Sequence, residues 1–464
     1  MKKRFIVAGV VLCLFFPGLL RGQETGLLRM NPDRRASEGE AAVWGGIEDG
    51  GFHPAYGSSF QWSAGAGAHG VRHGKSTSWT GALSFEQTMG KHMYSSMFLE
   101  PGYFPIDLVE VPQGVKSRQT CRLEGGFLTD FGYEWAAGLK ASVQGAHVSK
   151  RNEIRHSSFG LEAQVEPTVT YVMDDDMGLV SSYVFRLRTE NLNAEPSEAN
   201  QVFIDKGLRY GAYAEGIGAF PVLEFAHGFN ELFRCPELSL GFGITWKRGQ
   251  AGNPGQDRYR FPGSTLKAFY EQVCQADETD HVYRISYRRQ RDQLRMVTGE
   301  GDGIAAASDR HGRNLNLKYE ARFLKGILKS VAVDLDGNQW KERLLFFTDA
   351  VMRYDATAKL LSSFSYGPVD LDIDVLAGRG WWKDRGLDGQ EAEGQPLRMT
   401  DDWHRQMDYC LVPRTGMGGT LTCRIPAVKG LYTSLYAYWY HAFNITYLPG
   451  KNREIVTLKV GYQF

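Results

Sequence analysis

The sequence predicts an all-β fold, namely a transmembrane antiparallel up-and-down β-barrel of about 16 strands, within a range of roughly 14 to 18. Three observations predict it. The chain ends on an alternating strand with a terminal aromatic residue, and many internal segments alternate apolar and polar residues over about ten positions. An apolar stretch follows the start of the chain, and no uninterrupted run long enough for a transmembrane helix occurs after it.

The composition is compatible with β structure and gives no reason to expect nucleic acid as a partner. The 464-residue chain carries 53 basic and 53 acidic residues, so no strong field of either sign is expected. Glycine is frequent, with 54 residues, and aromatic residues make up 12% of the chain. Aromatic side chains favour strands and glycines favour tight turns, so this mixture favours β structure over helices.

The amino-terminal segment is predicted to be a cleaved signal peptide. Three basic residues precede an apolar stretch from Phe5 to Phe16. That stretch is too short to cross a membrane as a helix, which needs about 20 residues. The protein is therefore expected to be exported, and the barrel fold places it in the bacterial outer membrane. The predicted domains are the signal peptide (1–23), a polar lead-in (24–40) and the barrel (41–464).

Alternation with a period of two residues is the main pattern inside the chain. In the clearest example, Val369, Leu371, Ile373 and Val375 share one face of a strand and three aspartates share the other. Unpaired carboxylates cannot face a dry core, so the strand is expected to separate water from an apolar phase. Many such runs are longer than the mean of about 5–6 residues for soluble domains, and a tilted membrane strand needs about 9–11.

The polar faces of these strands are expected to line the lumen of the barrel. Both signs of charge occur there, which fits either a general pore or a lumen filled by charged networks and folded-in loops. The lumen-lining candidates are Glu162, Glu166, Arg186, Arg188, Lys318, Glu320, Arg322, Asp370, Asp372 and Asp374, with Arg284 and Arg288 on equivalent faces. Short turns are expected at 131–133, 174–178 and 367–368, and longer polar loops at 89–117, 190–204, 297–312 and 383–404.

The last eleven residues, EIVTLKVGYQF, resemble the assembly signal of outer-membrane barrels, with apolar residues at every second position and a final Phe. The last strand must pair with the first, because an open edge is not tolerated in lipid. The barrel-insertion machinery is therefore an expected partner, in addition to outer-membrane lipid. The residues of this predicted signal are Val456, Leu458, Val460, Tyr462 and Phe464.

Motifs for chemistry are weak, and no catalytic residue, metal site or cofactor is predicted. Gly65, Gly67 and Gly70 form a GxGxxG, but no helix is expected after them, so a dinucleotide site is not indicated. A faint calcium-loop pattern around Asp336-Gly337 is interpreted as a hairpin turn. The chain after the signal peptide has an odd number of cysteines, and a turn at 416–419 leaves a Cys410–Cys423 disulfide open.

Two short motifs add a resemblance to a family. Gly51-Phe52-His53-Pro54 precedes the first clear hairpin, and Phe261-Pro262-Gly263-Ser264-Thr265 opens a long strand. Together with the terminal strand, they resemble outer-membrane β-barrel proteins of the Bacteroidota, a family of unknown function. The resemblance spans the whole mature chain and implies a fold and a lineage, but no ligand or catalytic residues.

The function expected from these observations is non-enzymatic. The barrel would serve as a porin-like channel or as an accessory to a transport or secretion complex of the outer membrane, which would then be a partner. A barrel that receives an exported partner through its long loops is an alternative. A hydrolase with an active site at the barrel rim is another, because such residues can converge from distant strands.

Overall fold

The computed structural model describes residues 37–464 except 152–153, 175–176, 196–201, 215–216, 253–257, 299–302, 346–348, 386–396 and 399. The predicted signal peptide and most of the predicted lead-in lie outside the described residues. The first strand begins at Glu38.

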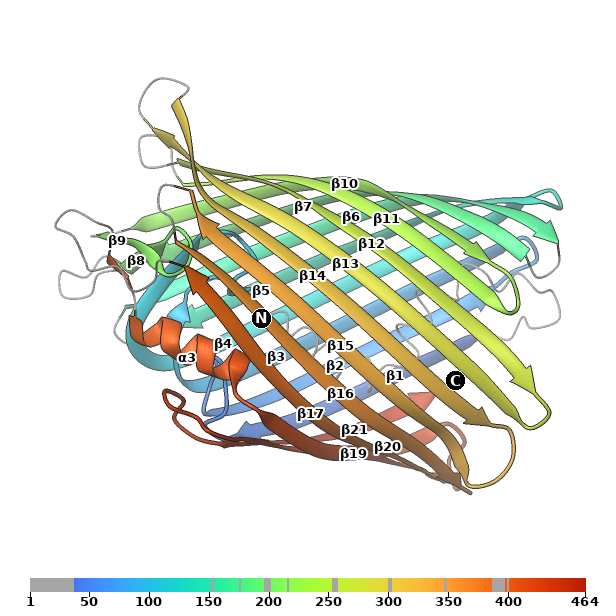
Figure 1. The fold of residues 1–464 in the computed structure, drawn as a ribbon. Coiled ribbons are helices and arrows are strands. Elements are labelled where there is room, and N and C mark those ends of the chain that lie inside the picture. Colours follow the sequence, from blue (N-terminus) through green and yellow to red (C-terminus); the bar gives the residue numbers. More distant parts are fainter. Residues whose placement is uncertain are drawn as a thin grey trace.

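Eighteen long strands form one closed antiparallel β-barrel, which confirms the predicted fold class (Figure 1). Each strand pairs with the barrel strands before and after it, and β1 closes the barrel against β21. The barrel strands are β1 (Glu38–Asp49), β2 (Phe60–His73), β3 (Thr77–Ser96), β4 (Asp107–Phe131), β5 (Trp135–Lys150), β6 (His156–Asp174), β7 (Met177–Ala194), β10 (Gly218–Arg234), β11 (Leu238–Ala251), β12 (Arg258–Ala276), β13 (Thr279–Thr298), β14 (Gly303–Phe323), β15 (Leu328–Leu344), β16 (Ala350–Tyr366), β17 (Val369–Arg385), β19 (Arg414–Arg424), β20 (Leu431–Ala442) and β21 (Asn452–Gln463).

The remaining elements lie in the connections between barrel strands. Two short strands form a hairpin between β7 and β10, and a third short strand and a helix lie between β17 and β19. Within the described residues, no helix is long and apolar enough to cross a membrane. These elements are β8 (Val202–Asp205), β9 (Tyr210–Ala214), β18 (Leu397–Arg398) and α3 (Thr400–Leu411).

The barrel has 18 strands, which is the upper limit of the predicted range. The prediction of about 16 was too low because small residues hide the alternation in some strands. In β1 and β19, glycine and alanine occupy positions where a larger side chain would have revealed the pattern. Gly416 and Gly418, where the sequence left a turn open, are in β19. A Cβ at either position would collide with Tyr438 of β20, so these glycines make room for that ring. The cysteines 410 and 423 are both free.

The two faces of the strands differ as the alternation predicts. On β17, Leu371, Ile373 and Val375 are 37%, 41% and 48% exposed, whereas Asp374 is buried. Similar exposed apolar side chains occur on strands all around the barrel, so its outer surface is apolar and suits lipid. The predicted hairpin turn at Asp336-Gly337 is wrong, because both residues lie inside β15, where Asp336 belongs to the polar face.

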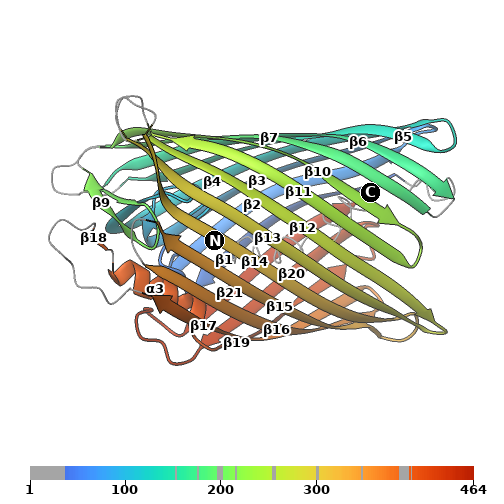
Figure 2. The same cartoon turned by 45° about the horizontal axis from the view of Figure 1, so that its top comes forward.

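The two ends of the barrel are unequal, and we call them the turn end and the loop end. The predicted short turns at 131–133 and 367–368 lie at the turn end, where both ends of the barrel chain also meet. The last residue of β6 and the first of β7, which flank the third predicted turn at 174–178, lie at this end too. The loop end carries the longer connections, although β3, β4, β7, β13 and β14 extend further into them than predicted. Figure 2 shows β9, β18 and α3 gathered at this one end.

Candidate functional site

Three segments fold from the loop end into the lumen. They are the connection between β3 and β4 (97–106), the β8–β9 hairpin and α3. The first contacts the inner face of two separate parts of the wall: the Leu99 amide donates to Glu190 of β7, and Arg310 of β14 donates to the Phe104 carbonyl. A segment that reaches both strands at once must lie inside the barrel.

The inward segments are held first by an apolar core. Phe98 and Phe104 pack edge to face at 5.5 Å, and Phe104 also lies against Phe261 of β12. This cluster is continuous with buried side chains on the inner faces of β7, β10, β13 and β14. A second cluster joins Met407 of α3 to Leu208 of the β8–β9 turn and to the wall at β15 and β16. The loop end is therefore packed like a protein interior.

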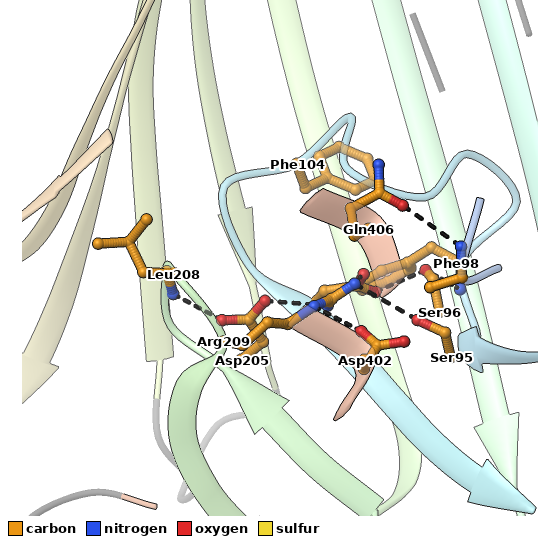
Figure 3. A network of polar contacts seen from close by, with 12 residues as sticks. Ser95, Ser96, Phe98, Phe104, Asp205, Leu208, Arg209, Asp402 and Gln406 are labelled. Atoms are coloured by element: carbon orange, nitrogen blue, oxygen red, sulfur yellow. Dashed lines mark hydrogen bonds and ion pairs between the residues drawn. The ribbon is translucent and has the colours of Figure 1, made fainter. Parts of the chain in front are cut away.

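A charged network centred on Arg209 connects the β8–β9 hairpin to α3 directly and, through Asp107 and Ser96, to the amide of Phe98 in the first segment (Figure 3). Its guanidinium lies 2.7 Å from Asp402 of α3, 3.0 Å from Asp205 of β8 and 3.4 Å from Asp107, the first residue of β4. It also donates to Ser95 at 3.3 Å. One cation thus joins three carboxylates that come from three separate parts of the chain.

The electrostatics of this network depend on burial. Burial by itself would lower the pKa of Arg209, but the carboxylates of Asp402, Asp205 and Asp107 outweigh it and raise that pKa above its ordinary value. Burial raises the pKa of Asp205, and the charge of Arg209 opposes that rise. The charges of Arg209 and the carboxylates therefore stabilise one another against the cost of burial.

The turn that carries Arg209 is strained. Leu208 and Arg209 have φ values of 50° and 60°, and the Tyr210 amide donates to the Gly207 carbonyl across the turn. Tight hairpins place residues at positive φ, but they normally use glycine or asparagine there. Keeping two other residues in this conformation costs on the order of 1 kcal/mol each or more, so surrounding contacts must hold them in place. The ion pairs of Arg209 and the amide of Leu208, which donates to Glu342, supply such contacts.

Two further buried polar networks lie near the inward segments. Glu110 of β4 lies 2.7 Å from both Lys116 and Lys150. Tyr103 donates to Glu224 at 2.6 Å. Burial and the Glu224 carboxylate raise the pKa of Tyr103 above its ordinary value, so the phenol remains a donor.

The predicted lumen-lining residues fall into three separate groups on the polar faces of their strands. The group from β6 and β7 meets the inward segments: Arg188 contacts Glu100 at 3.0 Å and Glu162 at 3.6 Å, and Arg186 contacts Glu224 at 3.0 Å. Glu166 accepts a hydrogen bond from Ser182. Arg186 and Arg188 therefore belong to the contacts that hold residues 97–106.

The other two groups lie nearer the turn end. On β14, Glu320 contacts Arg322 at 3.0 Å and Lys318 at 3.7 Å, and Arg284 of β13 lies 3.8 Å away. On β17, Asp370 pairs with Arg424 of β19, and Asp372 and Asp374 follow along the same face. These groups do not converge with the first one.

The predicted assembly signal lies on the outer face of β21. Val456, Leu458, Val460 and Tyr462 are all at least 40% exposed, and Phe464 is 68% exposed. The strand is paired on both sides, with β20 and with β1.

Residues central to the inward segments were missed in the sequence, among them Arg209, Asp205, Tyr103 and Asp402. For α3 a signal existed. Two acidic residues open it, and Trp403, Met407 and Leu411 follow at helical spacing. For Arg209 no local signal exists, because its partners are distant in the chain.

The described residues offer little for chemistry. They contain no group of three or more potential metal ligands. Two serine–histidine contacts occur, Ser59 with His92 and His73 with Ser78. Within the described part of the chain, neither histidine has a contacting carboxylate to complete a catalytic triad.

Comparison with known proteins finds similarity of fold alone. No family model matches the chain, and no curated protein matches it. Among solved structures, it is similar to the FrpB iron transporter from Neisseria meningitidis, with 9% identity, 95% of this chain and 83% of that chain covered, and a TM-score of 0.47. OccAB3 from Acinetobacter baumannii shows 11% identity over 92% and 99% of the two chains, with a TM-score of 0.36.

CdiB from Acinetobacter baumannii is also similar, with 8% identity, 92% of this chain covered and a TM-score of 0.38. The chain spans only 60% of the length of that protein. These scores are too low to bear on function. The fold itself defines the chain as a transmembrane β-barrel.

Proposed function

We propose that the protein is a non-enzymatic barrel of a bacterial outer membrane that acts as a channel closed at rest or as an accessory of a transport or secretion complex. The observation that carries this proposal is the set of three segments folded into the loop end and joined by Arg209. A packed, charge-linked obstruction inside the lumen is not expected of a permanently open pore.

The apolar outer face and the unequal ends support the location. Long connections at one end and short turns at the other are the arrangement of outer-membrane barrels, in which the long loops face outward. The inward segments would then close the lumen on the external side. The half-exposed charged groups on β14 and β17 would line a vestibule that opens at the turn end.

Conductance in planar bilayers tests the closed lumen. The mature protein is compared with a variant in which residues 400–411 are replaced by a Gly/Ser segment of the same length, so that the connection stays intact. We expect the native protein to show no steady open state and the variant to show a larger, more frequent conductance. A large steady conductance that is equal in both proteins would contradict closure by α3.

We further propose that the outward apolar residues of β21 form an assembly signal read by the insertion machinery, because they form a regular apolar face that ends in a highly exposed Phe464. Replacing Phe464 with Asp should reduce insertion while leaving export intact. The fraction of protein that shifts its gel mobility on heating in detergent measures insertion, and an unchanged fraction would contradict the proposal.

A further inference from the structure

A cluster of exposed cations covers one side of the barrel exterior near the loop end. On β13, β14, β15 and β17, outward positions that are apolar in the middle of the strand become basic toward the loop end. On β14, for example, Leu317 and Leu315 are followed on the same face by Arg313. We call this cluster the basic patch, and it consists of Arg289, Arg291, Arg313, Lys341, Arg343 and Arg379.

The patch places like charges beside one another. Arg289 of β13 lies directly opposite Arg313 of β14, and His311 lies opposite both Arg291 and Lys341. Side chains at directly opposed positions have Cβ atoms about 4.5–5.5 Å apart, and like charges there are destabilising. The arrangement therefore weakens the sheet unless an anion lies against it.

The described residues place few acidic groups next to the basic patch. Asp309 lies 3.4 Å from Arg291 and 3.8 Å from Arg343, and it also contacts His311. In the described part of the chain, Arg289, Arg313, Lys341 and Arg379 form no ion pair. A net positive charge thus remains on the outer surface.

The patch occupies one side of the barrel. On β7 and β10, the outward residues near the loop end are Asn191, Asn193 and Pro221, which are all uncharged. On β1 and β21, they include Asp49 and Glu454, which are acidic. A general attraction to an anionic membrane surface would not need such an uneven distribution.

An apolar hollow adjoins the patch on the side toward the turn end. It has a volume of about 660 Å³, and Arg379 lies in its lining. Small outward residues on three neighbouring strands, Gly337, Ala356 and Ala377, form part of its wall, and Leu315 and Phe443 lie at its sides. These small residues leave a hollow in the lipid-facing surface.

We propose that the basic patch and the hollow together bind a phosphorylated lipid of the leaflet that surrounds the loop end. Along the strands, the apolar hollow comes first and the cations follow toward the membrane surface. In a phosphorylated lipid the acyl chain likewise lies deeper in the membrane and the phosphate lies at its surface. Guanidinium groups bind phosphate through paired hydrogen bonds, and the phosphate relieves the repulsion between Arg289 and Arg313. This inference depends on the transmembrane fold and not on whether the lumen conducts.

Retention of added lipid, measured by native mass spectrometry of the mature protein released from mild detergent, tests the basic patch. The probes are diphosphoryl lipid A and, as a zwitterionic lipid, phosphatidylcholine. The test variant is R289Q/R313Q/K341Q, and the matched control is K325Q/K329Q/K429Q, which removes the same charge from exposed lysines at the turn end.

We expect the native protein and the control to retain the phosphorylated lipid and the test variant to lose at least about tenfold in retention, equivalent to about 1.4 kcal/mol. Equal retention by the test variant, or equal retention of phosphatidylcholine by the native protein, would overturn the proposal. A shift in gel mobility on heating in detergent shows that each variant is folded before it is compared.

The hollow is tested separately with G337L/A358L, which fills it and leaves every cation in place. A Cβ at Gly337 meets nothing closer than 3.8 Å, so the larger side chain can be accepted. Retention of the phosphorylated lipid should fall in this variant. Unchanged retention, or displacement of the lipid by millimolar inorganic phosphate alone, would show that only the phosphate is bound and would overturn the role of the hollow.

Discussion

The two halves of the lumen use the same residue types in different ways. At the loop end, Arg209 is 11% exposed and joins three carboxylates that are themselves buried. At the turn end, Arg424 is 55% exposed and pairs with a single carboxylate, that of Asp370. The first arrangement fastens separate chain segments to one another, whereas the second joins neighbouring strands that backbone hydrogen bonds already hold.

The number of ion pairs therefore says little about how much each pair contributes to stability. A buried charge that loses its partner costs about 3–5 kcal/mol, whereas an exposed pair contributes about 0–1 kcal/mol. The loop half should therefore respond strongly to single substitutions and the turn half weakly. Three substitutions, given in order of decreasing expected loss of stability, test this contrast.

The largest effect is expected for Arg209→Gln. Loss of the guanidinium leaves Asp107, Asp205 and Asp402 buried close together without the cation that they share, at a cost of about 3–5 kcal/mol to the docked state of the hairpin and α3. Hydrogen exchange of the amides in residues 202–214 and 400–411 should then become much faster, while the barrel strands stay protected. Arg424→Gln is the matched control. Equal protection of α3 in both variants would contradict the central role of Arg209.

A smaller effect is expected for Met407→Ala. Met407 is buried against Leu208 and Val351, and truncating a buried methionine costs about 2–5 kcal/mol, with the lower end expected where the site can collapse. Exchange in α3 should increase, but less than in Arg209→Gln. Met417→Ala, on the exposed outer face of β19, is the control and should leave α3 unchanged. A greater effect from Met407→Ala than from Arg209→Gln would show that apolar packing, rather than charge, holds the helix.

The turn half could be predicted from the sequence better than the loop half, for a physical reason. Alternation along β14 or β17 follows from local geometry, because successive side chains point to opposite faces of a strand. The alternation therefore separates the aspartates of β17 from the apolar face of that strand. Arg209 meets Asp402 only because the barrel closes and brings distant connections together, and no local pattern encodes that meeting. The Gly-rich β19 was missed because its glycines make room for Tyr438 of the neighbouring strand, which the sequence of β19 alone does not reveal.

The smallest effect is expected for Asp370→Asn at the turn end. The pair that it breaks is partly exposed, so water and salt already screen it, and the loss of stability should stay below about 1 kcal/mol. The temperature at which the heated protein changes its gel mobility should hardly move, and any change should shrink further at high salt. Exchange in α3 should match the native protein, because Asp370 lies at the opposite end of the lumen. If Asp370→Asn instead loosened the loop end as Arg209→Gln does, the two halves would form one cooperative unit, and the turn half could not be an independent vestibule.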